Sequence, residues 1–103
     1  MELIETSLFT KQVQAGLSDA EYRALQLYLI LQPDVGDVIP GSGGLRKMRW
    51  GLAGRGKRGG ARVIYYWKPA AGQIFLLLFY PKNVRTNLSL AELRTLRKLV
   101  ADD

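Results

Sequence analysis

Apolar residues near the start of the chain recur at helical spacing. Residues 2–8 predict a short strand, and a helix follows because Phe9, Val13 and Leu17 lie four positions apart. Gly16 predicts the end of that helix, since glycine is common just beyond a helix C-terminus. The chain therefore begins with a strand and an amphipathic helix.

Two further helices are marked by capping boxes, in which a serine and a glutamate three positions later each bond the other's backbone N–H. The first box is Ser18–Glu21 and the second is Ser89–Glu92. Pro33 predicts the end of the first of these helices, because the residue before a proline avoids the helical conformation.

Between these helices the pattern becomes that of strands. A loop over residues 34–44 leads to predicted strands at 45–50, 61–68 and 73–80. The last is almost continuously apolar, which predicts a central strand covered on both faces. The predicted order is β-α-α-β-β-β-α. It describes one α+β domain over residues 1–103, a small, largely antiparallel sheet flanked by helices.

Alternation along the strands sorts the side chains onto two faces. We expect one face to meet the helices through Met48, Trp50, Val63 and Trp67. The other face is then open and carries Lys47, Arg49, Arg62 and Tyr66. Antiparallel pairing of neighbouring strands brings Arg62 near Arg49. Lys82 and Asn83, just past the last strand, complete the rim of this face.

Charge is distributed very unevenly along the chain. No Asp or Glu occurs from Val38 to Ala91, although the same zone holds ten Lys and Arg residues. The net charge of +6 understates this, because all nine acids lie outside the zone. A field of one sign attracts polyanions, and RNA is the polyanion that we expect.

Composition excludes several classes of protein. The chain has neither Cys nor His, which excludes disulfides, argues against a zinc site and rules out Ser-His-Asp or Cys-His catalysis. At 48% hydrophobic it is too apolar for a disordered basic tail. The N-terminus lacks a signal-peptide pattern and no apolar run is long enough to span a bilayer, so we expect a cytoplasmic protein without cofactor.

The basic face has an ordinary interpretation and a functional one. Exposed strand faces are usually polar and solvated. Here, however, like charges crowd on neighbouring strands, at a cost of a few tenths of a kcal/mol per pair or more, and we expect no nearby acid to relieve it. That crowding favours an anion-binding surface, with Arg46 beside Lys47 as a further contact.

The loop between the first two of these three strands is rich in glycine and base. Arg55, Lys57 and Arg58 are set among four glycines, in a spacing that does not match a Walker loop. The loop is either a flexible connection with solvated bases or a phosphate clamp. Of the strand aromatics, Trp50, Tyr65 and Trp67 suit the core, and Tyr66 is the one expected near a ligand.

Taken in order, three segments resemble the RelE/HigB superfamily of bacterial type II toxins, and the HigB-like members most. The segments are 43–49 (GGLRKMR), 56–66 (GKRGGARVIYY) and 80–83 (YPKN). The resemblance covers roughly residues 18–100. It implies a ribosome-dependent endoribonuclease that cleaves mRNA without metal or cofactor. It also implies a neutralising antitoxin, often of helix-turn-helix type.

The resemblance also assigns roles to individual residues. The family's basic catalytic positions match Lys47, Arg49, Arg62 and Lys82. We expect RNA contacts from Arg46, Arg55, Lys57, Arg58, Tyr66 and Asn83. The chain lacks both the C-terminal tyrosine and the histidine of some relatives, so the general base is left open. Lys47 among cations is one candidate, and purely orienting residues are the alternative.

Two other functions remain compatible with the sequence. Members resembling ParE inhibit DNA gyrase on the same fold, but generally lack the clustered basic face. A non-catalytic RNA- or ribosome-binding module is the third possibility, because fold alone does not decide function.

Overall fold

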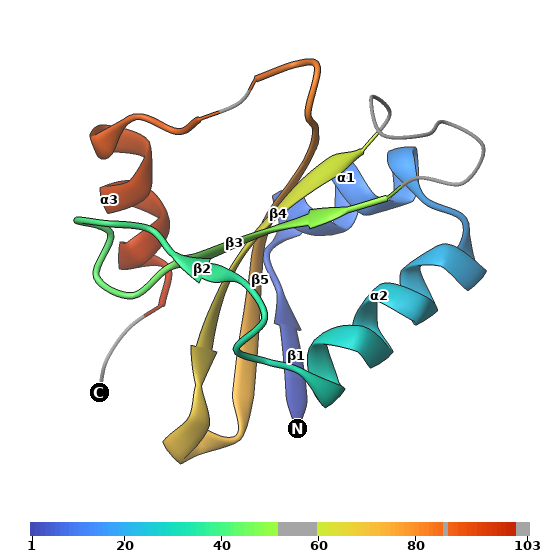
Figure 1. The fold of residues 1–103 in the computed structure, drawn as a ribbon, viewed down its shortest axis with the longest axis horizontal. Coiled ribbons are helices and arrows are strands. Elements are labelled where there is room, and N and C mark those ends of the chain that lie inside the picture. The colour runs from blue at the N-terminus through green and yellow to red at the C-terminus, as the bar shows by residue number, and fades with distance from the viewer. Residues whose placement is uncertain (52–59, 86, 101–103) are drawn as a thin grey trace.

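The computed structural model describes residues 1–51, 60–85 and 87–100 (Figure 1). The strands are β1 (Glu2–Glu5), β2 (Asp37–Val38), β3 (Arg46–Trp50), β4 (Ala61–Lys68) and β5 (Gln73–Pro81). The helices are α1 (Ser7–Gly16), α2 (Asp19–Leu31) and α3 (Leu90–Lys98), with a 3-10 turn at Pro69–Ala71. The α+β class and the predicted order are confirmed, except that β2 was not predicted.

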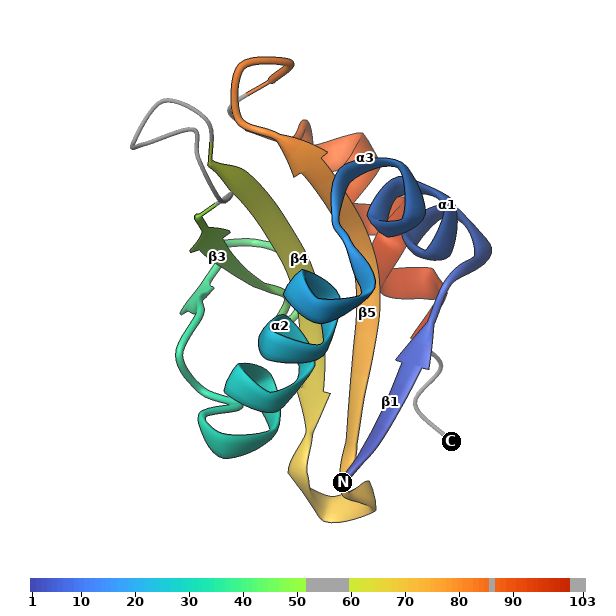
Figure 2. The same cartoon turned by 90° about the vertical axis from the view of Figure 1, so that its right-hand side faces the viewer.

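The five strands form one sheet in the order β1-β5-β4-β3-β2. Only β1 runs parallel to its neighbour, β5, and the other pairs are antiparallel. Helices α1 and α2 cover one face and α3 lies on the other, as the two perpendicular views show (Figures 1 and 2). The prediction that β5 is central and covered on both faces is therefore confirmed.

Local signals account for where the helices begin. Both predicted capping boxes are present, at Ser18 with Glu21 and at Ser89 with Glu92. The first strand ends at Glu5 and not at residue 8, because Thr6 is the N-cap of α1 and its hydroxyl accepts the Phe9 N–H. The same Thr6 hydroxyl donates to the Leu77 carbonyl at 3.0 Å, which ties α1 to β5.

Two apolar clusters hold the helices to the sheet. The cluster under α1 and α2 contains Phe9, Leu25, Leu29, Met48 and Val63, with Trp50 and Trp67 packed against it, as predicted. The cluster under α3 joins side chains of α3 to the opposite face, including Leu45, Ile64, Leu77, Tyr80, Leu93 and Leu96. This second cluster contradicts the expectation of an open face, because α3 covers part of it.

A register shift in β4 and β5 enlarges the second cluster. Ile64 pairs with Leu78 and Tyr65 with Leu76, so Leu77 has no partner in β4. An extra residue of this kind is a β-bulge, and it reverses the alternation of the strand beyond it. Leu77 and its neighbour Leu78 therefore both contribute to the α3 side.

Candidate functional site

Three of the predicted basic residues, Lys47, Arg49 and Arg62, lie in two rows that cross the α3 face of the sheet. Strand register puts Arg49 opposite Arg62, as predicted, and Arg62 opposite Tyr80. Two residues away along β3, Lys47 lies opposite Ile64 of β4 on one side and Asp37 of β2 on the other. Rows on one face are two residues apart, which is roughly 7 Å. We call these the Arg49–Arg62–Tyr80 row and the Asp37–Lys47–Ile64 row.

Arg62 occupies the middle of its row and is only half-buried. Its Nε is nevertheless buried without a hydrogen-bond partner among the residues that the structure describes. A buried donor without a partner costs about 1–3 kcal/mol, and natural proteins contain few of them. Arg62 therefore has one buried donor that no described residue satisfies.

Tyr80 places a phenol near the same charges. Burial raises the pKa of Tyr80, while the guanidinium groups of Arg62 and Arg85 oppose that shift. The side chain is almost fully buried, with 6% of its surface exposed. The sequence pattern did not predict Tyr80 as a site residue, because a tyrosine in a nearly continuous apolar strand is expected to lie in the core.

A pocket of about 210 Å³ opens between the sheet and the start of α3. Its polar lining comes from Lys47, Tyr80 and Asn87. Its other walls are apolar: Ile39, Pro40, Ile64, Leu88, Leu90 and Leu93. Apolar walls with a few placed polar groups are typical of ligand sites, although this pocket is small for one. It suits a small, flat group attached to an anion that lies on the basic rows.

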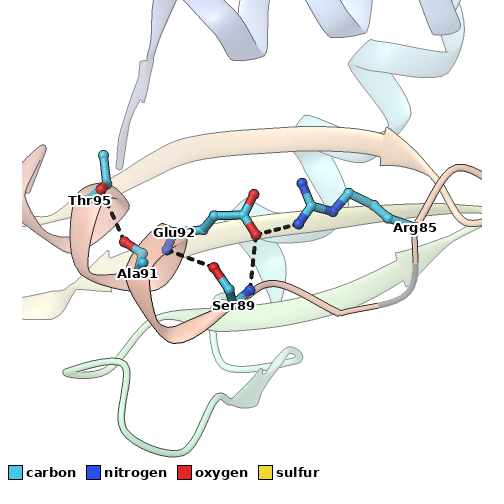
Figure 3. A network of polar contacts seen from close by, with 5 residues as sticks. All are labelled: Arg85, Ser89, Ala91, Glu92 and Thr95. Atoms are coloured by element: carbon cyan, nitrogen blue, oxygen red, sulfur yellow. Dashed lines mark hydrogen bonds and ion pairs between the residues drawn. The ribbon is translucent and has the colours of Figure 1, made fainter.

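Arg85 is a cation that the sequence did not place. Its guanidinium donates to the Glu92 carboxylate, which also accepts the Ser89 N–H at 3.0 Å, while the Glu92 N–H donates to the Ser89 hydroxyl (Figure 3). The hydrogen bond from Arg85 is the largest cause that lowers the pKa of Glu92 to about 2. The capping box of α3 therefore also holds Arg85 near Tyr80.

Lys82 and Asn83 lie in the turn beyond β5. The Lys82 N–H donates to the Gly60 carbonyl at 3.0 Å, and Ala61 pairs with Pro81. The turn is thus tied to the start of β4, one residue from Arg62. Lys82 is half-buried and Asn83 is exposed, which places both at the end of the sheet where the Arg49–Arg62–Tyr80 row lies.

Arg46 is separated from the other predicted contacts. It alternates with Lys47 and lies on the α2 side, where its guanidinium donates to the carbonyls of Gly36 at 2.7 Å and Asp34 at 3.1 Å. It also lies over the Trp67 ring at 6.0 Å. The structure therefore gives Arg46 a fixed structural role away from the two rows.

Tyr66 lies on the α3 face as predicted, but its ring meets Arg97 there, with the guanidinium 4.7 Å from the ring centroid. Arg97 also donates to the Gly43 carbonyl at 3.0 Å. These contacts join β4, the segment before β3 and α3. The predicted loop contacts Arg55, Lys57 and Arg58 lie outside the described residues.

Two acids from outside the acid-free zone reach the basic face. Asp37 arrives on β2 opposite Lys47, and Glu92 arrives on α3 and pairs with Arg85. The expectation that no acid lies near the bases is therefore wrong, although the bases still outnumber the acids there. A two-residue strand is too short to show a period, so no sequence pattern marks Asp37 as a strand residue.

Other kinds of site are not apparent in the described part of the chain. Among those residues no group of three or more acidic side chains is placed to hold a metal ion. None of the three described helices combines the length and apolar character that a bilayer-spanning helix needs.

Comparison with known proteins gives one family match and one similar fold. Residues 37–102 match the family model described as the RelE toxin of the RelE/RelB toxin–antitoxin system. Among solved structures, the fold is similar to that of a double-arginine variant of the E. coli toxin RelE in the free state. The TM-score is 0.61 at 13% identity, over 96% of this chain and 95% of that one. At that identity the structural likeness concerns the fold alone.

Proposed function

The chain belongs to the RelE toxin family, and we propose that it is a type II toxin that cleaves translated mRNA on the ribosome. The observation that carries the proposal is the Arg49–Arg62–Tyr80 row beside Lys47 and Lys82. Family membership supports the toxin class, and the clustered cations support RNA as the substrate. The cleavage reaction itself is the proposal.

The reaction needs no nucleophile from the protein, because RNA carries its own 2′-hydroxyl beside each phosphate. It needs a base for the 2′ proton, positive charge at the phosphorane and a proton for the leaving 5′-oxygen. Arg49 and Arg62 suit the phosphorane, since guanidinium stays charged and binds phosphate through two N–H groups. Lys47 and Lys82 flank them and supply further charge.

The Nε of Arg62, which no described residue satisfies, supports this assignment. Such a buried donor gains a partner when a phosphate oxygen arrives. This hydrogen bond forms only in the complex, so it stabilises bound RNA without stabilising the free protein. Arg62 is therefore the residue on which we expect cleavage to depend most.

The pocket beside Lys47 gives the RNA a second contact. With the scissile phosphate on the rows, the neighbouring nucleotide lies over the pocket opening lined by Tyr80 and Asn87. The ribosome then holds the message in line for attack, and such positioning alone accounts for a large part of many rate enhancements.

The antitoxin is the second expected partner. We propose that its contact surface is acidic, because it must neutralise the basic face. Association measured over a salt series should slow markedly as ionic strength rises. A rate independent of salt would remove the electrostatic argument and leave the nuclease proposal intact.

The site assignment is tested with purified ribosome complexes and single-turnover cleavage. Lys47→Ala and Arg49→Ala should each reduce the chemical step, and the double variant should lose less than the sum if the residues act as one unit. Arg23→Ala on the exposed side of α2 is the matched control and should cleave normally. Full activity in the double variant would move the site elsewhere.

A further inference from the structure

Asp37 is an acid that the fold places beside the predicted catalytic cations. In β2 it lies directly opposite Lys47, and directly opposed residues have Cβ atoms about 4.5–5.5 Å apart on one face. The face is the α3 side, because Lys47 lines the pocket with Leu93 and Ile39 packs into the α3 cluster. Asp37 itself is exposed. A carboxylate therefore stands next to Lys47 in the open part of the site.

The turn before Asp37 is fixed from the other side of the sheet. The hydroxyl of the buried Tyr65 donates to the Pro33 carbonyl and accepts the Gly36 N–H, both at 2.8 Å. Arg46 donates to the carbonyls of Asp34 and Gly36. Hydrogen bonds from Tyr65 and Arg46 therefore hold the turn that leads into the two-residue strand β2.

Gly36 allows the turn to lie this close. A Cβ at this position would come within 2.8 Å of the Tyr65 ring and 2.9 Å of the Lys47 carbonyl oxygen. Real Cβ atoms do not approach so closely, so only glycine fits here without displacement. The backbone just before Asp37 is thus packed directly against that of Lys47, which fixes the backbone position from which the carboxylate extends.

We propose that Asp37 is the general base of the cleavage reaction, an inference that rests on the proposed function. A carboxylate beside a cation lets two neighbouring side chains divide the roles of proton acceptor and positive charge, and β2 places Asp37 opposite Lys47 in that way. Preorganisation of a base on a rigid element is a general requirement of catalytic sites. It also fills the role that the absence of histidine leaves open.

The step balances without a further reactant. Asp37 takes the proton of the 2′-hydroxyl, the 2′-oxygen–phosphorus bond forms, and the phosphorus–5′-oxygen bond breaks. The Lys47 ammonium gives a proton to the leaving 5′-oxygen. The products are a 2′,3′-cyclic phosphate and a 5′-hydroxyl end, and proton exchange with water restores both side chains.

The competing explanation is that Asp37 only protects an edge strand. Charged residues on edge strands discourage pairing with other chains. An acid with that role would repel RNA, so its removal would tighten binding and leave the chemical step unchanged. If Asp37 is the general base, its removal slows the chemical step. The rate of that step therefore distinguishes the two explanations.

The experiment is single-turnover cleavage on programmed ribosomes with wild type, Asp37→Asn and Asp37→Glu. General-base catalysis typically contributes about a hundred- to ten-thousand-fold, so Asp37→Asn should lose that factor at saturating toxin. Asp37→Glu should recover part of the rate. Asp34→Asn, an exposed acid in the same turn, is the control and should match wild type.

The outcomes separate the two proposals. If wild type cleaves the message and Asp37→Asn cleaves it equally fast, Asp37 is not the general base, and the nuclease function still stands. An equal loss in Asp34→Asn assigns the effect to the turn and also overturns it. A wild-type protein that cuts no message, on or off ribosomes, overturns both proposals together.

Discussion

The α1–α2 face and the α3 face of the sheet differ in how completely helices cover them. On the first, two helices pack over Met48, Val63, Tyr65 and Leu76, all of which are nearly or fully buried. On the second, one nine-residue helix covers Ile64, Leu77 and Tyr80, and the two rows of charge extend beyond it. The first face therefore carries stability, and the second combines a smaller core with the site.

The buried polar groups of the two faces differ in charge. On the α1–α2 side the Tyr65 hydroxyl both donates and accepts a hydrogen bond, while the neutral Trp67 Nε1–H has no partner among the described residues. On the α3 side the buried donor without a described partner is Arg62 Nε, which belongs to a cation. Proteins often accept such local cost at functional sites. Substitutions on the two faces should therefore have separable effects on unfolding and on cleavage, except at Tyr65, which supports the turn before Asp37.

The largest expected effect is on stability, from Phe79→Ala. Phe79 is 2% exposed and packs edge-to-face against Phe9, so its removal should cost about 3–5 kcal/mol of unfolding free energy. Denaturant unfolding measures the loss, and the fraction still folded should cleave at the wild-type rate. A cleavage defect per folded molecule would show that the two faces are coupled.

The opposite pattern, a loss of cleavage without a loss of stability, is expected from Arg62→Met. Methionine keeps the apolar packing of the stem and removes the charge, so cleavage should fall roughly a hundred- to a thousand-fold, or about 2.7–4 kcal/mol. Because the unpaired Nε is removed too, the melting temperature should stay unchanged or rise. A variant that melts much earlier would make Arg62 a structural residue.

An intermediate effect is expected from Tyr65→Phe, which acts across the sheet. It leaves the Pro33 carbonyl and the Gly36 N–H without their shared partner and should cost about 1–3 kcal/mol of stability. The same change loosens the turn before Asp37, so cleavage by folded protein should also fall. Normal cleavage would mean that the turn needs no such support.

The N-cap of α3 should have a smaller effect. Ser89→Ala removes the acceptor of the Glu92 N–H and should cost about 1 kcal/mol. Ser18→Ala at the start of α2 is the matched variant, because it removes the same kind of bond on the other face. Equal losses in stability are expected, and only Ser89→Ala should alter cleavage, through Arg85 and Glu92.

The smallest expected effect is the pH dependence that Glu92 contributes. Its pKa is lowered from 4.5 to about 2, chiefly by Arg85, so the folded state favours the ionised form. The stability it gives is complete above about pH 4.5 and is lost as pH falls toward 2. Thermal unfolding of wild type and Glu92→Gln should converge over that range. If the difference in stability between the two proteins does not change with pH, the Arg85–Glu92 pair has no role in stability.

Local signals explain why much of the fold was predictable. Capping boxes fix helix starts within four residues, and the bounds of β4 follow from a run of Val, Ile, Tyr and Trp flanked by turn signals. The pairing of Arg49 with Arg62 was also predictable, because antiparallel neighbours joined by a loop face each other near it.

The remainder depends on contacts between distant segments. β2 is defined by its partner β3, and nothing within Asp37–Val38 marks a strand. Coverage of Ile64 and Tyr80 by α3 depends on how the chain returns after β5, and the Leu77 bulge reverses the strand's alternation. For the same reason Asp37, Tyr80 and Arg85 could not be placed beside Lys47 and Arg62 from sequence patterns.

The central claim, that the basic face cleaves translated mRNA, is tested most directly by mapping RNA ends with purified components. Messages would be incubated with wild type or Arg62→Met, with and without ribosomes. We predict new 5′-hydroxyl ends within the translated region, only with wild type and only when ribosomes are present. Intact messages under every condition, together with gyrase-dependent DNA breaks in cells that express the protein, would contradict it.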